Sequence, residues 1–212
     1  PSDYQLNFLL LKLYWRICDW ELLEKQLIKL NKLTNFHHES GPMIFMYLED
    51  QPFIQLNRSI AYYDYKFRCK PKEIKFVEKS KTRIGYFSNG FYQHSTMVLL
   101  ARIIELHNKN SFEIYIYDYG IHQEDSYTKR IKACSDKYYS VHNLSNNELV
   151  ELARKDELDI AIDLMGYTKL NRAIIFSYRL APVQVSYLDY PGSTGNKSID
   201  YILADKTLIP KS

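Results

Sequence analysis

The amino-acid sequence predicts an α/β fold with a mostly parallel sheet, preceded by a small all-helical segment. Short β-branched and aromatic runs alternate with amphipathic stretches over residues 82–204, whereas residues 1–75 show helical spacing only. A charged stretch, KPKEIKFVEKSK at residues 70–81, lies between these regions. We therefore expect a helical segment over residues 1–75, a linker, and a sheet domain over residues 80–212.

The helical segment is expected to begin with a hairpin of two helices. An apolar stretch from Phe8 to Ile17 leads to Asp19, which is suited to cap the next helix. The apolar residues of that helix recur at spacings of three and four: Leu22, Leu23, Leu27, Leu30 and Leu33. A third helix is expected from Phe53 to about Arg68, where Pro71 prevents its continuation. The segment is compatible with the last unit of a helical repeat array.

The sheet domain is expected to contain six strands and three helices. The strands are Thr82–Phe87, Phe112–Tyr119, Lys137–Val141, Ile160–Leu164, Val183–Tyr187 and Tyr201–Ala204. The helices are Ser95–Leu106, a helix from a capping box at Ser145–Glu148 to Lys155, and Lys169–Tyr178. Because strands and helices alternate, we expect βαβ units and parallel pairing.

Composition argues against several classes of function. The 212 residues carry a net charge of +3 without a dense Lys/Arg cluster, which argues against a nucleic-acid partner. No apolar run approaches the ~18 residues of a membrane-spanning helix. The three cysteines are far apart, which indicates a reducing compartment and hence the cytoplasm. No histidine has a partner at metal-ligand spacing and no Asp-x-Asp occurs, so we expect no metal site.

Polar residues follow two expected strands that are close together in sequence. Ligands bind past the carboxyl ends of strands in an open α/β sheet, so these ends predict a site. Asp163 either faces this site or caps the turn before Gly166. Lys169 and Arg172 would share a helix face beside the hydroxyl of Thr168. They either contact a phosphate or acidic group or belong to a solvated helix start.

The loop after the next strand, Asp189–Gly195, is the second part of the predicted site. Pro191 and Gly192 form a turn pair. Ser193, Thr194 and the backbone N–H groups either line a sugar or phosphate or belong to an ordinary turn.

A third candidate is the loop that precedes the helix expected at Ser95. This loop leads directly to a helix N-terminus, where backbone N–H groups favour anions. Its glycine spacing fits neither a Walker loop nor a dinucleotide fingerprint. His94 is either a loop residue at the helix cap or a catalytic or ligand-orienting imidazole.

Four segments together resemble a known enzyme family. They are RIGYFSNGFYQHSTMVLL (residues 83–100), LMGYTKLNR (164–172), RLAPVQVSYLDYPGSTG (179–195) and IDYILAD (199–205). They are similar to the N-terminal half of the catalytic region of protein O-GlcNAc transferases and their SPINDLY-type plant relatives. The helical segment resembles the region that joins that family's tetratricopeptide (TPR) repeats to its catalytic lobes.

The resemblance implies a Rossmann-like sheet that forms the N-terminal lobe of a GT-B glycosyltransferase. The family transfers N-acetylglucosamine from UDP-GlcNAc to Ser or Thr of acceptor proteins, with inversion and without a required metal or a cofactor beyond the nucleotide-sugar. His94 matches the active-site histidine of this lobe. The other residues that match the family's binding loops are Tyr167, Thr168, Lys169, Arg172, Leu188, Tyr190, Pro191 and Gly192.

The sequence also departs from the family pattern. Asp189 stands where glycine is usual, Ser95 where proline is common, and Gly90 and Tyr92 occupy positions that often hold an acidic residue and a glycine.

The C-terminal lobe of the family has no counterpart in this sequence, so we expect a partner lobe from a longer chain and no catalysis by this chain alone. The predicted binding loops, Tyr167–Arg172 and Tyr190–Thr194, would then be solvent-exposed. Two alternatives stay open: a GDP-fucose-dependent protein O-fucosyltransferase of the same family, and a non-catalytic protein-binding module.

Overall fold

The computed structural model describes residues 3–33, 41–67, 69 and 71–209. By their packing, the residues form two units: Pro1–Arg68 with Gly192–Gly195, and Cys69–Pro191 with Asn196–Ser212. The division therefore falls after Arg68, and the loop 192–195 is grouped with the helical unit, in contrast to the boundaries expected from the sequence. No helix in the described part of the chain is long and apolar enough to cross a membrane.

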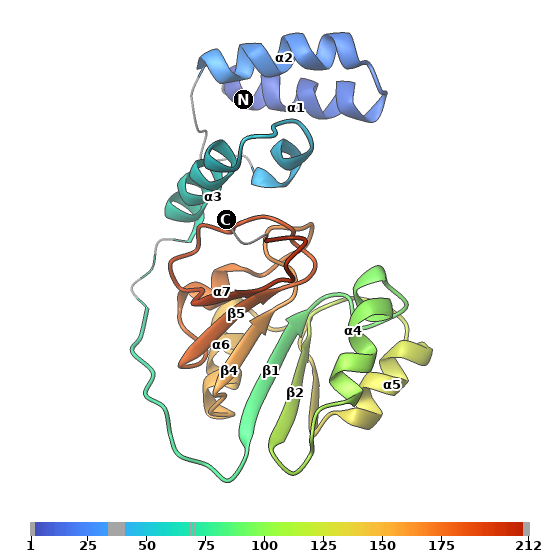
Figure 1. The fold of residues 1–212 in the computed structure, drawn as a ribbon, viewed down its shortest axis with the longest axis vertical. Helices are drawn as coiled ribbons and strands as arrows, with labels where there is room; N and C mark the ends of the chain where they lie inside the picture. Colours follow the sequence, from blue (N-terminus) through green and yellow to red (C-terminus); the bar gives the residue numbers. More distant parts are fainter. Residues whose placement is uncertain (1–2, 34–40, 68, 70, 210–212) are drawn as a thin grey trace. The chain divides into compact units, whose positions relative to one another are not determined.

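The helical unit begins with the expected hairpin. Its elements are α1 (Asp3–Arg16), α2 (Trp20–Leu33), the 3₁₀-helix η1 (Pro42–Tyr47) and α3 (Pro52–Lys66) (Figure 1). Asp19 caps α2 as predicted, since its carboxylate accepts a hydrogen bond of 3.1 Å from the N–H of Leu22. Leu11, Leu30 and Phe45 form part of the buried core of this unit. The expected end of the third helix, Arg68, lies outside the described residues.

The sheet unit confirms the predicted α/β class. Its strands are β1 (Thr82–Ser88), β2 (Phe112–Asp118), β3 (Lys137–Ser140), β4 (Ile160–Asp163), β5 (Val183–Tyr187) and β6 (Tyr201–Leu203). They form one sheet in the order β3-β2-β1-β4-β5-β6, and all described pairs are parallel. The expected strands agree with these bounds to within one residue at each end.

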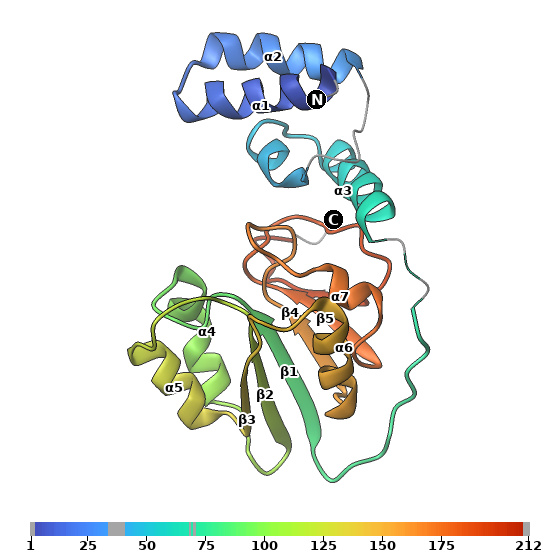
Figure 2. The ribbon, with the colours of Figure 1, turned by 180° about the vertical axis from the view of Figure 1, so that it is seen from behind.

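Helices cover both faces of this sheet, as parallel sheets require. They are α4 (Ser95–Glu105), α5 (Ser126–Cys134), α6 (Asn146–Lys155) and α7 (Ile174–Ser177). Leu100 of α4 and Ile131 of α5 belong to the core on one face of the sheet. Leu149 of α6 and Phe176 of α7 belong to the core on the other (Figures 1 and 2).

Helix α5 was not expected from the sequence. Its sequence is mostly polar, and only Thr128 and Ile131 are buried, so its apolar period is weak. The local signal is instead a capping box, in which Asp125 accepts from the N–H of Thr128 and the Thr128 hydroxyl lies near the N–H of Asp125.

The expected helix Lys169–Tyr178 is wrong over most of its length. Only Ile174–Ser177 is helical, because Leu170 has a φ of +61°, which ends the turn that Gly166 begins. Asn171 stabilises this irregular path by accepting a hydrogen bond from the N–H of Ala173. Lys169 and Arg172 therefore do not share a helix face.

A substitution of Gly85, in the middle of β1, tests how closely the sheet is packed there. A Cβ there would lie 2.5 Å from Leu158 Cδ1 and 3.1 Å from the rings of Phe87 and Tyr117. We expect Gly85→Ala to destabilise the sheet unit by about 1–3 kcal/mol through overpacking. Hydrogen exchange of the β1 and β2 amides measures this loss locally. The matched control is Gly41→Ala, where the Cβ meets nothing within 4 Å; equal protection in the two variants would contradict the packing described.

Candidate functional site

The candidate site lies where the strand order reverses, between β1 and β4. The chain leaves these two neighbouring strands in opposite directions, and ligands of open α/β sheets bind at such a position, past the carboxyl ends of the strands. Ser88, at the end of β1, donates its hydroxyl to the sulfur of Met165 beyond β4 at 3.3 Å. The amide of Asn89 donates to the backbone oxygen of Lys169 at 3.4 Å. The structure thus brings together two of the predicted loops, the one after β1 that leads to His94 and the one after β4.

His94 is the residue that caps α4. Its Nδ1 lies 3.3 Å from the backbone nitrogen of Thr96 and 3.0 Å from the Thr96 hydroxyl oxygen. The imidazole is half-buried, and the ring of Tyr92 lies beside it with a centroid distance of 5.5 Å. Its position at a helix cap is confirmed, and its role in catalysis stays a prediction.

A second histidine, which the sequence did not identify, supports this loop. The ring of His122 stacks on Tyr92, with a centroid distance of 4.7 Å. Asp118, buried at the end of β2, lies 2.8 Å from His122 Nε2 and also accepts from the Tyr138 hydroxyl and the N–H of Gly120. His122 has no metal-ligand spacing and follows Asp118 by four residues in a loop, so the only available signal was the strand end itself.

Asp163 caps the turn after β4, as one of its two sequence-based interpretations predicts. It is 2% exposed, and its Oδ1 accepts from the N–H groups of Met165 (2.9 Å) and Gly166 (3.1 Å). Burial raises the pKa of this carboxyl to about 6, and the negative charge of Asp189 acts in the same direction, against the two N–H donors.

The predicted exposure of the binding loops is wrong for two tyrosines. Tyr167 is 5% exposed and Tyr190 is 4% exposed, and their rings meet edge to face at 5.4 Å between centroids. The cause is the turn at Gly166, which has a φ of +49° and runs so close to Tyr190 that a Cβ would lie 2.5 Å from the tyrosine Cβ. Thr168 donates its hydroxyl to Met165 O at 2.9 Å, and Lys169 is exposed.

Arg172 holds the loop that follows β3. Its guanidinium donates to Asn146 Oδ1 at 2.8 Å, to Leu144 O at 2.7 Å and to Val141 O at 3.3 Å. Burial lowers the pKa of this group, against the opposing influence of Tyr119. The geometry gives Arg172 a structural role, and a contact with substrate stays a prediction.

The predicted loop after β5 is divided between the two units. Leu188, with a φ of +80°, and Pro191, which is exposed, belong to the sheet unit together with Asp189. Gly192, Ser193 and Thr194 are grouped with the helical unit; Ser193 is exposed, whereas Thr194 is buried. The predicted exposure of Thr194 is therefore wrong as well.

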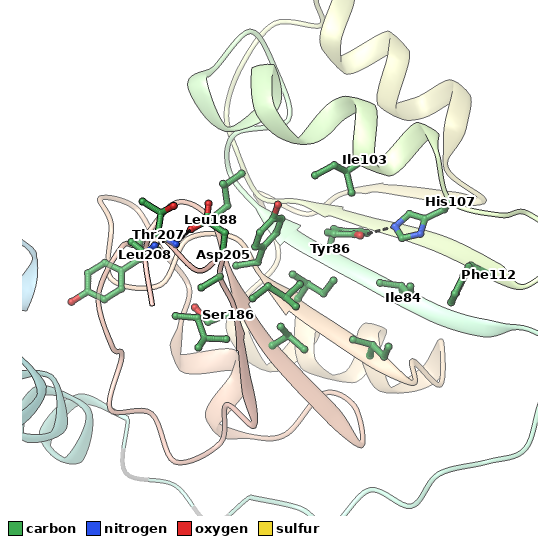
Figure 3. Close-up of a pocket in the computed structure, with 18 residues that line it drawn as sticks. Ile84, Tyr86, Ile103, His107, Phe112, Ser186, Leu188, Asp205, Thr207 and Leu208 are labelled. Atoms are coloured by element: carbon green, nitrogen blue, oxygen red, sulfur yellow. Dashed lines mark hydrogen bonds between the residues drawn. The ribbon is translucent and has the colours of Figure 1, made fainter. Parts of the chain in front are cut away.

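A large pocket of ≈ 1060 Å³ lies beside α4, on the face of the sheet that this helix covers (Figure 3). Its lining is mostly apolar and includes the buried Tyr86 and the half-buried His107, whose hydroxyl and Nε2 lie 2.7 Å apart. Of the predicted site residues, Leu188 and Tyr190 line it. Among the residues that the structure describes, no lysine or arginine lines the pocket, and this lining is poorly suited to a diphosphate.

Metal binding finds no support in the part of the chain that the structure describes. No group of three His, Cys, Asp or Glu side chains is placed there to hold a metal ion.

A family model described as "Glycosyl transferase family 41" matches residues 57–212. The chain is 32% identical over 130 residues to a probable UDP-N-acetylglucosamine–peptide N-acetylglucosaminyltransferase SEC of Arabidopsis thaliana, covering 61% of this chain and 13% of the relative. It is 30% identical over 131 residues to the UDP-N-acetylglucosamine–peptide N-acetylglucosaminyltransferase of Caenorhabditis elegans, covering 61% of this chain and 11% of the relative. It is 28% identical over 131 residues to a probable UDP-N-acetylglucosamine–peptide N-acetylglucosaminyltransferase SPINDLY of Oryza sativa subsp. japonica, covering 60% of this chain and 14% of the relative.

A solved structure is similar over more of the chain. An O-GlcNAc transferase mutant from Thermobaculum terrenum superposes with a TM-score of 0.76 at 28% identity, covering 88% of this chain and 37% of that one. This chain therefore spans only a small part of the curated relatives and little more than a third of the solved one.

Asp163 predicts a pH-dependent stability. Because folding raises its pKa from 3.8 to about 6, the stability that this carboxyl contributes is present at acid pH and is lost as the pH rises from about 4 to 6. Above pH 6, we expect the free energy of unfolding of Asp163→Asn to exceed that of the parent by up to about 3 kcal/mol. The difference should vanish toward pH 4. Urea unfolding at several pH values measures this difference.

Asp136 provides a control of opposite sign. Burial acts to raise the pKa of its carboxyl, but the N–H of Ile114 and the ammonium of Lys109 lower it overall. We therefore expect Asp136→Asn to lose stability above pH 4, and a gain at neutral pH in both variants would contradict the account of Asp163.

Variants of Arg172 and Lys169 compare a cation that is held by hydrogen bonds with one that is exposed. Arg172→Lys removes donors from the backbone oxygens of Val141 and Leu144, so we expect a loss of about 1–3 kcal/mol in the free energy of unfolding. Lys169→Met, on an exposed side chain, should change it by less than about 0.5 kcal/mol. Thermal unfolding compares the two variants, and equal stability would show that the guanidinium is not held as described.

Proposed function

Because the chain belongs to glycosyl transferase family 41, we propose that it forms the N-terminal catalytic lobe of a protein O-linked glycosyltransferase. The reaction is the transfer of N-acetylglucosamine from UDP-GlcNAc to Ser or Thr hydroxyls of acceptor proteins, with inversion and without a metal or further cofactor. The observation that carries the proposal is the family match over residues 57–212, which contain the carboxyl ends of β1 and β4 and the loop that leads to His94.

The chemistry required is a displacement at the anomeric carbon. The acceptor hydroxyl forms the new glycosidic bond, the bond to the diphosphate oxygen breaks with its electron pair leaving on the nucleoside diphosphate, and the hydroxyl proton is released to solvent. His94 is half-buried at the start of α4 and is placed to orient the acceptor or the sugar. The N–H groups at the start of this 11-residue helix favour the negative charge that develops on the leaving diphosphate.

The complete enzyme needs more than this chain. The sheet unit supplies one side of a cleft, and the chain covers only 37% of the similar O-GlcNAc transferase structure. We propose that a C-terminal lobe holds most of the nucleotide and that this chain is inactive alone. The cytoplasmic location rests on the sparse cysteines, and the repeat affiliation of the helical unit rests on the α1–α2 hairpin.

The test uses the full-length protein, with UDP-GlcNAc and GDP-fucose as donors and an acceptor protein. We expect transfer from UDP-GlcNAc and a loss of about 10²-fold or more in kcat/KM for His94→Ala. His142→Ala, an exposed histidine after β3, is the matched control and should retain activity. Transfer from GDP-fucose and not from UDP-GlcNAc would contradict the proposed donor. Unchanged activity of His94→Ala would contradict the proposed role of this histidine.

A further inference from the structure

The side chains of Asp189, Thr96 and His94 form a chain of contacts that joins the loop after β5 to the start of α4. The Thr96 hydroxyl donates to Asp189 Oδ1 at 3.0 Å, across 93 residues of sequence. The same hydroxyl oxygen lies 3.0 Å from His94 Nδ1. Thr96 is 2% exposed, so water does not compete for its hydroxyl.

The hydroxyl of Thr96 has one hydrogen, so it can donate a hydrogen bond either to Asp189 or to His94, but not fully to both. An ionised carboxylate can only accept, so the hydrogen is directed to Asp189. The Thr96 oxygen then presents only lone pairs to the imidazole, and His94 Nδ1 must be the donor in that contact. A neutral imidazole with its proton on Nδ1 carries a lone pair on Nε2.

We propose that Asp189, acting through Thr96, is a positioning residue that holds His94 in the Nδ1–H tautomer. The Nε2 lone pair is then available to accept a hydrogen bond from the acceptor hydroxyl, a consequence that rests on the proposed function.

The simpler role of His94, as a helix cap, makes the opposite demand on the same atom. To cap α4, Nδ1 must be unprotonated and accept from the N–H of Thr96, which lies at 3.3 Å. The contact with the hydroxyl oxygen is the shorter of the two, at 3.0 Å. Because one nitrogen cannot serve both roles in the neutral ring, the tautomer distinguishes them.

Two pairs of variants separate the hydrogen-bond chain from general packing. Thr96→Val removes the hydroxyl at nearly the same volume, whereas Thr96→Ser keeps it. Asp189→Ala removes the acceptor, whereas Asp189→Asn keeps an oxygen that can accept from the Thr96 hydroxyl. If Thr96 contributed only to packing, Thr96→Val and Thr96→Ser would change the stability of the protein but not the tautomer of His94.

The test is solid-state ¹⁵N NMR of the full-length protein labelled at histidine, at about pH 8.5, where an imidazole is neutral. The His94 signals are assigned by their loss in His94→Asn. We expect a protonated Nδ1 in the parent, Thr96→Ser and Asp189→Asn, and a protonated Nε2 in Thr96→Val and Asp189→Ala. A protonated Nε2 in the parent, or a tautomer that does not change in Thr96→Val, would overturn the proposal.

Kinetics separate this proposal from the proposed function. We expect Thr96→Val and Asp189→Ala to lower kcat by about 10-fold or more, with KM for UDP-GlcNAc little changed, and the Ser and Asn variants to recover most of the activity. The expected tautomers together with unchanged kcat in all four variants would support the hydrogen-bond chain and contradict the role of His94 in transfer.

Discussion

The reversal of strand order between β1 and β4 is the constraint on which the rest of the structure depends. All described strand pairs are parallel, so every strand ends at the same edge of the sheet. Residues that are distant in sequence meet there, as Thr96 at the start of α4 and Asp189 after β5 do. The loops that follow β1 and β4 meet at this edge through the side chains of Ser88 and Asn89. Fold and site are therefore consequences of one topology.

Most of the sheet was predictable because its signals are local. Each strand has its own apolar or β-branched run, and α6 is marked by the capping box of Ser145 and Glu148, which the structure confirms. Helix α5 was not predicted because its sequence is mostly polar, and Ile131 is its one fully buried large side chain among the described residues. Helix α7 is short because the positive φ of Leu170 breaks a stretch that sequence spacing favours as helix.

The site was predictable as a place but not as a set of contacts. Strand ends located His94 and Asp163, and the family resemblance identified Tyr167 and Tyr190. The burial of these tyrosines depends on ring packing between two loops, which follows from the register of β4 and β5 and from the backbone turn at Gly166. Asp189 was noted only as a departure from the family pattern, because its contact with Thr96 exists only in the folded chain.

The most direct test of the central claim, that the carboxyl edge between β1 and β4 is where transfer takes place, is a crystal structure of the full-length protein. It should contain a nucleotide-sugar analogue and an acceptor peptide. We expect the acceptor hydroxyl within hydrogen-bond reach of His94 Nε2, about 2.6–3.2 Å. An acceptor bound elsewhere, for example over the apolar pocket beside Tyr86 and His107, with no contact to His94, would contradict the claim.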